Sequence, residues 1–189
     1  MRTLTWVAVY MLAACGGSQS GGPAQPAAVS PDAATFSAHG MSVERPDGWM
    51  FMQPDQSLAP DTAVVLQGPV GGDMVAPVVE IGRRPLTASQ RRFADSALLS
   101  SMVMEISQTY DGFETVTGPE NVQVAGKAAS RLVVKLTESL PNGGEVERLG
   151  RIYGVVDGAQ MWVIRCVGPR DGSADKQFDA IVESLRLGW

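Results

Sequence analysis

The sequence of 189 residues is poor in the residues that most enzymes and metal sites use. It has two cysteines, Cys15 and Cys166, and a single histidine, His39. These three residues do not assemble a structural zinc site, which takes four ligands. A serine–histidine–aspartate hydrolase would have to use His39, which falls in an expected turn, and the sequence has no Gly-x-Ser-x-Gly motif. We therefore assign no catalytic residue, no metal site and no cofactor.

An excess of basic residues is also absent. Fifteen Lys and Arg against twenty Asp and Glu give a formal net charge of −5. Broad nucleic-acid binding and adhesion to anionic lipid both need a basic surface, so the composition excludes both. The apolar fraction of 44% and charged fraction of 19% are those of a folded globular protein. The length suffices for one domain with a core plus appended sequence.

The N-terminal apolar run is too short to anchor the chain in a bilayer. It covers residues 4–12, whereas a stable membrane helix takes about 20 residues. Its length fits the apolar region of an export signal, and Arg2 supplies the positive charge that precedes such a region. The sequence LAAC follows, with the small residues Ala13 and Ala14 before Cys15. It resembles the lipobox of bacterial lipoproteins.

This resemblance predicts that residues 1–14 are a lipoprotein signal peptide, cleaved between Ala14 and Cys15. The Cys15 thiolate would take a diacylglyceryl group, and its freed amine would then be acylated, typically by palmitate. Each buried methylene gives about 0.8 kcal/mol, so two or three acyl chains hold a protein on the membrane. The alternatives are an ordinary signal peptide with a chance cysteine, or a buried apolar N-terminus.

A flexible tether is expected after the signal peptide, with the lipidated cysteine at its start, over residues 15–34. Glycine, serine, proline and alanine dominate this segment, so it cannot bury a core. Such a tether reaches about 25 Å on average. Gly16 gives no acidic retention signal after the cysteine, which favours the outer membrane slightly over the inner one.

Residues 35–189 have the pattern of a single folded domain. Strand-like residues 35–49 contain turn signals at His39-Gly40 and at residues 46–48, and Trp49 after the second turn is expected in the core. Residues 61–70 and 74–86 are rich in valine and isoleucine. Pro77 predicts an edge or bulged strand for the second of these.

The second half of the domain combines two helices with long strands. Apolar residues recur at helical spacing in residues 87–110 and 173–186. Residues 113–139 are strand-like, and hairpin signals at residues 141–144 and at Asp157-Gly158 join strands that follow. We therefore expect three long antiparallel strands between residues 128 and 167. Period-two alternation puts Cys166 on one face with Trp162 and Ile164, as a buried and unreactive thiol.

The order of strands, helix, strands and helix predicts an α+β fold. Long hairpins make the central sheet mainly antiparallel, and the two amphipathic helices must cover it. The expected architecture is an α/β/α sandwich.

The domain also resembles the PsbP/Mog1-like superfamily, which includes small bacterial lipoproteins. The motifs that carry the resemblance are VERPDGW near the domain start, a long helix, VQVAGKAASRLVV, the hairpin RIYGVVDGAQMWVIRCVGP and the closing FDAIVESLRL. The resemblance implies a central antiparallel sheet between helices. Members act mostly as binding or assembly factors, in photosynthetic complexes or on a small GTPase, and no catalytic or partner-binding residues carry over.

Two pairs of arginines are candidates for an anion or partner patch. Arg83 and Arg84 lie at an expected strand end, and Arg91 and Arg92 lie in the expected first helix turns. A short connector separates the pairs, so four guanidinium groups could bind a carboxylate or phosphate. Arginines at a helix N-terminus oppose the helix dipole, so helix stability does not explain them. The alternative is a solvated rim with local ion pairs.

Together these features predict a lipid-anchored protein of the bacterial envelope. Its domain would be a non-enzymatic binding or assembly module with a protein partner, and its other contact would be the bilayer, through acylated Cys15. The alternatives are a small-ligand-binding domain with a pocket between sheet and helix, or a periplasmic hydrolase. The alternative for Trp49, and a role open to Trp189, is an exposed aromatic that anchors a partner. A deep polar pocket would favour a ligand or catalysis, and a flat apolar patch a partner.

Overall fold

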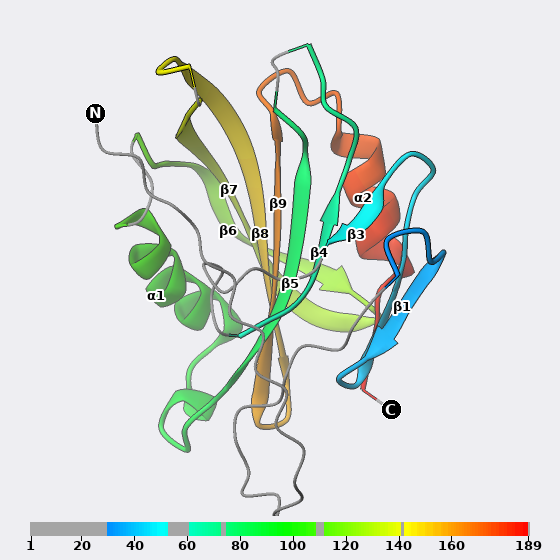
Figure 1. The fold of residues 1–189 in the computed structure, drawn as a ribbon. Helices are drawn as coiled ribbons and strands as arrows, with labels where there is room; N and C mark the ends of the chain where they lie inside the picture. The colour runs from blue at the N-terminus through cyan, green and yellow to red at the C-terminus, as the bar shows by residue number, and fades with distance from the viewer. Residues whose placement is uncertain (1–29, 53–60, 73–74, 109–111, 141, 189) are drawn as a thin grey trace, which may run out of the picture.

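The computed structural model describes residues 30–52, 61–72, 75–108, 112–140 and 142–188. A large antiparallel sheet dominates these residues and lies between two helices (Figure 1). In spatial order its seven strands are β3 (Met50–Met52), β4 (Thr62–Gln67), β5 (Val78–Pro85), β9 (Gln160–Pro169), β8 (Glu145–Asp157), β7 (Lys127–Ser139) and β6 (Glu114–Val124). The expected signal peptide, Cys15 and Trp189 lie outside the described residues.

Tight hairpins build the longest part of the sheet, as the turn signals predict. Asp157 pairs with Gln160 across a two-residue loop between β8 and β9, and β7 pairs with β8 in continuous register. A further hairpin divides the strand-like residues 113–139 into β6 and β7. Its two turn residues, Ala125 and Gly126, have φ of 53° and 72°. Two consecutive positive φ values are those of the turn that best fits the twist of paired strands.

One face of the sheet is closed by helix α2 (Asp175–Ser184) and a small second sheet. That sheet contains β1 (Thr35–Ala38), β2 (Met41–Glu44) and β10 (Arg186–Leu187). We call this side of the large sheet the α2 face. Trp49 is 3% exposed there and makes an edge-on contact with Phe178, with ring centroids 6.0 Å apart. The prediction that Trp49 belongs to the core is therefore confirmed.

The opposite face packs against helix α1 (Asp95–Ser107), and we call it the α1 face. Leu98, Leu99 and Val103 point from the helix into a second apolar cluster with residues of β7, β8 and β9. The two helices lie on opposite sides of the sheet, which confirms the expected α/β/α sandwich (Figure 1). Among the described helices, none is both long and apolar enough to cross a membrane.

The first helix begins later than its sequence pattern predicts. Residues Gln90–Arg92 form a separate 3-10 turn, and Phe93 and Ala94 are extended before α1 begins at Asp95. The Thr87 hydroxyl accepts a hydrogen bond from the Gln90 backbone N–H, while the Gln90 side chain accepts one from the Thr87 N–H. These reciprocal bonds close a local turn, so the expected helix start at residue 87 was wrong.

Pro77 does not mark an edge strand, so that part of the expectation is wrong, although the pairing of β4 with β5 does shift register between Thr62 and Val64. Strand β5 begins at Val78, directly after the proline, and lies between β4 and β9 inside the sheet. Because Pro77 precedes the strand, its missing N–H removes no hydrogen bond from the ladder. Its carbonyl accepts a hydrogen bond of 2.8 Å from the Gly68 N–H.

The packed domain includes the end of the segment that composition assigns to the tether. The Arg45 guanidinium donates to the carbonyl oxygens of Asp32 and Ala33, at 3.3 and 2.9 Å. The Phe51 N–H donates to the Pro31 carbonyl at 3.3 Å. Arg45 belongs to the VERPDGW motif, so this motif ties residues 31–34 to the start of β3.

Candidate functional site

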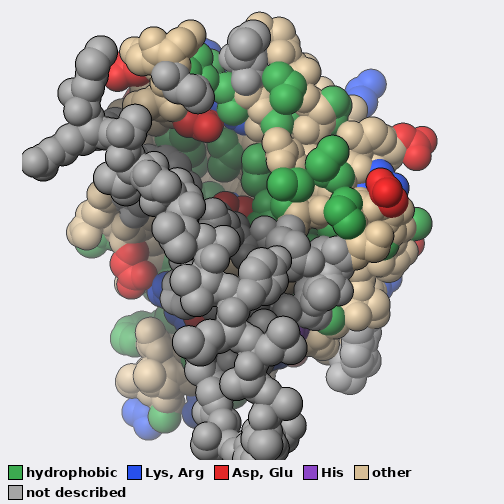
Figure 2. All heavy atoms as spheres, in the orientation of Figure 1, with side chains coloured by type: hydrophobic (Ala, Val, Ile, Leu, Met, Phe, Trp, Pro, Cys, Tyr) green, Lys and Arg blue, Asp and Glu red, His purple; other side chains and the backbone are tan. Residues whose placement is uncertain are grey.

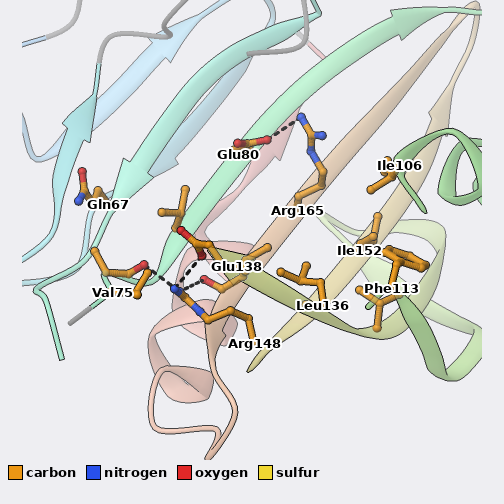
Figure 3. Close-up of a pocket in the computed structure, with 15 residues that line it drawn as sticks. Gln67, Val75, Glu80, Ile106, Phe113, Leu136, Glu138, Arg148, Ile152 and Arg165 are labelled. Carbon is orange, nitrogen blue, oxygen red and sulfur yellow. Dashed lines mark hydrogen bonds and ion pairs between the residues drawn. The ribbon is translucent and has the colours of Figure 1, made fainter. Parts of the chain in front are cut away.

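Helix α1 leaves part of its sheet face uncovered, and a hollow lies there. The helix contacts β6, β7 and β8, while β3, β4 and β5 extend beyond it. The hollow has a volume of about 270 Å³. Its apolar walls include Ile106 of α1 together with Phe113, Val134, Leu136 and Ile152 (Figure 3). In the space-filling view, hydrophobic side chains gather around a hollowed region in the upper part of the molecule (Figure 2).

Strand alternation places charged side chains inside this hollow. Glu80 of β5 lies opposite Arg165 of β9 in the register, so both point to the α1 face. Their side chains form an ion pair of 2.5 Å, and they are only 16% and 21% exposed. Figure 3 shows this pair across the hollow from Arg148 and Glu138.

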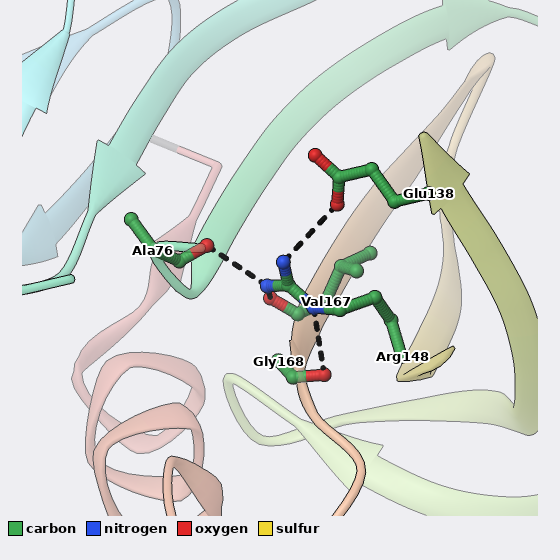
Figure 4. Close-up of polar contacts among 5 residues, drawn as sticks. All are labelled: Ala76, Glu138, Arg148, Val167 and Gly168. Atoms are coloured by element: carbon green, nitrogen blue, oxygen red, sulfur yellow. Dashed lines mark hydrogen bonds and ion pairs between the residues drawn. The ribbon is translucent and has the colours of Figure 1, made fainter. Parts of the chain in front are cut away.

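Arg148 forms the other charged wall and is almost completely buried. Its Nε donates to the Gly168 carbonyl at 3.1 Å, and Nη2 donates to the carbonyls of Ala76 and Val167 at 2.8 and 3.4 Å (Figure 4). Its Nη1 donates to Glu138 Oε2 at 3.1 Å. Arg148 therefore ties β8 to the end of β9 and to the segment before β5, and it lines the hollow at that end.

A smaller hollow of about 50 Å³ continues along α1 and shares Ile106 and Arg165 with the first. Arg84 lies in it, with Nε 3.0 Å from Asp61 and Nη1 2.9 Å from Glu105 of α1. Its contacts with Glu105 and Asp61 raise the pKa of Arg84 above its ordinary value. We call the two hollows together the α1-face groove.

The larger hollow of the groove combines apolar walls with charges that are already paired. Among the described residues that line the larger hollow there is no serine, threonine, cysteine, histidine or lysine, and the carboxylates Glu80 and Glu138 are each paired with an arginine. A nucleophile with an adjacent base is the usual requirement of a hydrolase. Over the described ranges, no group of His, Cys, Asp and Glu side chains is arranged to hold a metal ion.

The arginines singled out from the sequence do not all converge. Adjacent residues on β5 point to opposite faces, so Arg84 lies in the α1-face groove while Arg83 donates to the His39 carbonyl at 2.9 Å. Both arginines are among the residues around the smaller hollow, and their use as an anion or partner patch stays a prediction. Arg91 and Arg92 are exposed in the 3-10 turn, so the helix dipole no longer bears on them. Their role in binding a partner stays a prediction.

Cys166 has the inert character expected from its strand. It is fully buried on the α2 face with Trp162 and Ile164, and its thiol is free. Burial raises the pKa of the Cys166 thiol far above its ordinary value, so the reactive thiolate does not form near neutral pH.

The sequence analysis did not identify the charged residues of the groove. Glu80, Glu138, Arg148 and Arg165 come from four strands that meet only in the sheet. A signal was present, because Arg165 shares its strand face with Met161, Val163 and Val167. A charged residue among apolar residues on one strand face lies either at the solvated edge of the core or inside a binding site. Sequence periodicity alone does not distinguish these two cases.

No protein-family model matches the sequence, and a search of curated proteins also finds no match. Solved structures do match in shape. The cyanobacterial PsbP protein (CyanoP) of Synechocystis sp. PCC 6803 is 14% identical with a TM-score of 0.57, over 81% of this chain and 91% of that one.

LpqN of Mycobacterium tuberculosis, described as involved in cell envelope biogenesis, is 15% identical with a TM-score of 0.53, over 79% of this chain and 83% of that one. A protein of Bacteroides thetaiotaomicron is 12% identical with a TM-score of 0.52, over 82% of this chain and 48% of that one. At such identities the likeness is one of fold. The chain therefore has the PsbP-like α+β fold that its sequence motifs predict.

Proposed function

We propose that this protein is an exported, lipid-anchored envelope protein and a non-enzymatic binding or assembly module that engages its target through the α1-face groove. The observation that carries the proposal is the groove itself. It has apolar walls, the charges of its larger hollow are paired, and the described residues that line this hollow include no serine, threonine, cysteine, histidine or lysine. Such a site offers shape and complementary charge to a ligand.

The proposed location of the protein in the cell envelope rests on its N-terminal sequence. LAAC at residues 12–15 follows an apolar run of export-signal length, and a segment of tether composition follows Cys15. The shared fold of LpqN, a protein described as involved in cell envelope biogenesis, is consistent with this address. Gly16 favours the outer membrane slightly over the inner one.

Two kinds of target fit the α1 face. The hollow of about 270 Å³ favours a small ligand, since ligand pockets typically begin near 300 Å³. Met50 and Met52 favour a protein partner, because they are 45% and 37% exposed on the strand next to β4. Exposed methionines form adaptable apolar contacts. They lie on the same face as the groove, since Met50 pairs with Gln67, one of its lining residues.

The anchor is tested by the variant Cys15→Ser in the natural host. We expect it to lose labelling by radioactive palmitate and to leave the membrane fraction, because serine provides no thiol for the diacylglyceryl thioether. Ser18→Ala, in the same segment, is the matched control and should label normally. Labelling of Cys15→Ser at the wild-type level would refute the assignment.

The use of the groove is tested by placing a photoreactive amino acid at Gln67, which lines it, or at Val116, exposed on the opposite edge strand. Illumination of native membranes should give crosslinked products from position 67 and not from position 116. Equal products from both positions, or turnover of a substrate in a hydrolase screen, would reverse the proposal.

A further inference from the structure

We propose that the α1-face groove binds a single-chain lipid with a zwitterionic headgroup, of the lysophosphatidylethanolamine type, taken from the membrane that carries the protein. This inference rests on the proposed function and specifies the ligand of the same site. The chain would lie against the apolar walls, and the headgroup would meet the arginine–glutamate pairs.

The apolar walls are suited to an acyl chain. Ile106, Phe113, Leu136 and Ile152 form one continuous side of the hollow (Figure 3). The smaller hollow adds about 50 Å³ beside Met102, Glu105 and Ile106 of α1. Burial of a chain methylene gives about 0.8 kcal/mol, so each methylene that these apolar walls cover would add to binding.

The charges of the groove specify the headgroup. Arg148 is held by three backbone carbonyls, whereas Arg165 and Glu80 face each other at the surface of the hollow. A purely anionic ligand that took Arg165 would leave the Glu80 carboxylate without its partner, and a purely cationic one would leave Arg165 unpaired. An unpaired, largely buried charge is strongly unfavourable. A zwitterion offers a phosphate to Arg165 and an ammonium to Glu80, so both charges stay paired.

The position of the tether brings this site toward the membrane. Pro31 binds Phe51 in β3, directly between the exposed Met50 and Met52. The segment from Cys15 to residue 30 has the composition of a tether with a reach of about 20 Å. A domain of net negative charge gains nothing from anionic lipid, so its approach to the bilayer would use the apolar methionines.

The experiment uses the full-length acylated protein in phosphatidylcholine vesicles. The probe is lysophosphatidylethanolamine with a photoreactive group at the end of its chain, and labelled positions are mapped by mass spectrometry. We expect labels on peptides that contain Ile106, Phe113 or Leu136. Unlabelled lysophosphatidylethanolamine should compete better than lysophosphatidylglycerol, whose headgroup carries no ammonium.

Two matched substitutions separate groove binding from general membrane contact. Val78→Trp fills the groove from β5 and should lower labelling by about tenfold or more, the affinity equivalent of two buried methylenes. Val116→Trp introduces the same side chain on the far edge strand and should leave labelling unchanged. Gln67→Trp repeats the block from β4, in case Val78→Trp does not fold by circular dichroism. Equal labelling of groove-blocked and Val116→Trp proteins would overturn the proposal.

The variant Glu80→Gln tests the headgroup assignment. Without its carboxylate, the site should reverse its preference and bind lysophosphatidylglycerol better than the zwitterion. An unchanged preference would overturn the assignment.

The variant Cys15→Ser tests where the acyl chain in the groove comes from. If only Cys15→Ser is labelled, the acyl group attached to the protein's own Cys15 occupies the groove in the wild type. The proposal that the lipid is taken from the membrane would then be wrong. If labelling of wild type and Cys15→Ser is equal in the groove, the inference stands, whether or not Cys15 carries lipid.

Discussion

The two faces of the large sheet use the same strands in different ways. On the α2 face, Trp162, Ile164 and Cys166 of β9 are enclosed by α2 and the small sheet. On the α1 face, Arg165 and Val167 of the same strand line a hollow that helix α1 leaves open. Neighbouring residues of one strand thus belong to a closed core and to an open site. The closed core on the α2 face can therefore stabilise the strands whose other face lines the open site.

Charged residues also differ in position between the faces. On the α2 face, Arg151 pairs with Asp175 and Asp179 of α2, and the aspartate side chains are about half exposed. On the α1 face, Arg148 and the Arg165–Glu80 pair lie within the hollow. Ion pairs at the rim lose little hydration when they help to hold a helix in place. A charge inside a cavity is strongly destabilising once its partner is removed, because it is then left buried and unpaired.

The largest expected effect is the loss of an aromatic ring from the closed face. Phe178→Ala should lower the free energy of unfolding by about 3–5 kcal/mol, because Phe178 is 2% exposed and packs on Trp49. Ile106→Ala, in the half-covered wall of the groove, should cost about 1–2 kcal/mol, since less of that side chain is buried. Urea unfolding measures both, and equal losses would contradict the division between the faces.

An intermediate effect is expected at Arg148, whose side chain is fully buried on the open face. Arg148→Met should lower the free energy of unfolding by about 3 kcal/mol, because it deprives three backbone carbonyls and Glu138 of their donor. Glu138→Gln keeps all the carbonyl contacts and changes a side chain that is 44% exposed, so its cost should stay below about 1 kcal/mol. A larger loss for Glu138→Gln than for Arg148→Met would show that the ion pair, and not the backbone contacts, stabilises this end.

The smallest effect is a pH dependence of the closed face. Burial raises the pKa of Cys166, whereas in the unfolded chain its thiol ionises near its ordinary value of about 8.5. Above that value the unfolded state binds fewer protons than the native state, so stability falls as pH rises, by up to about 1.4 kcal/mol per pH unit. Below it, the contribution is fully present. Cys166→Ala should remove this slope in urea unfolding between pH 8 and 9.5, and parallel slopes for the two proteins would argue against an enclosed thiol.

Much of the fold follows from signals that act over a few residues. The hairpins predicted from Asp157-Gly158 and from the turn signal before β8 are both present, since Asp157 pairs with Gln160 and Ser139 pairs with Glu145. Alternation in β9 assigns Cys166 to the core correctly. The helix start was missed because Thr87 and Gln90 satisfy each other's backbone groups in a local turn, although the same residues also fit a helical pattern. Pro77 was misread because a proline just before a strand and a proline inside one look alike in sequence.

The sequence by itself excluded a basic binding surface and determined the hairpins and the two faces of each strand, while lipid attachment at Cys15 stays a prediction from it. Only the tertiary structure decided where a site lies, because the groove depends on how far α1 covers the sheet. Arg148 shows the physical reason. Its partner Ala76 is 72 residues away, and packing of β9 and the segment before β5 brings the two together. Local periodicity specifies which way a side chain points, and long-range packing specifies what it meets there.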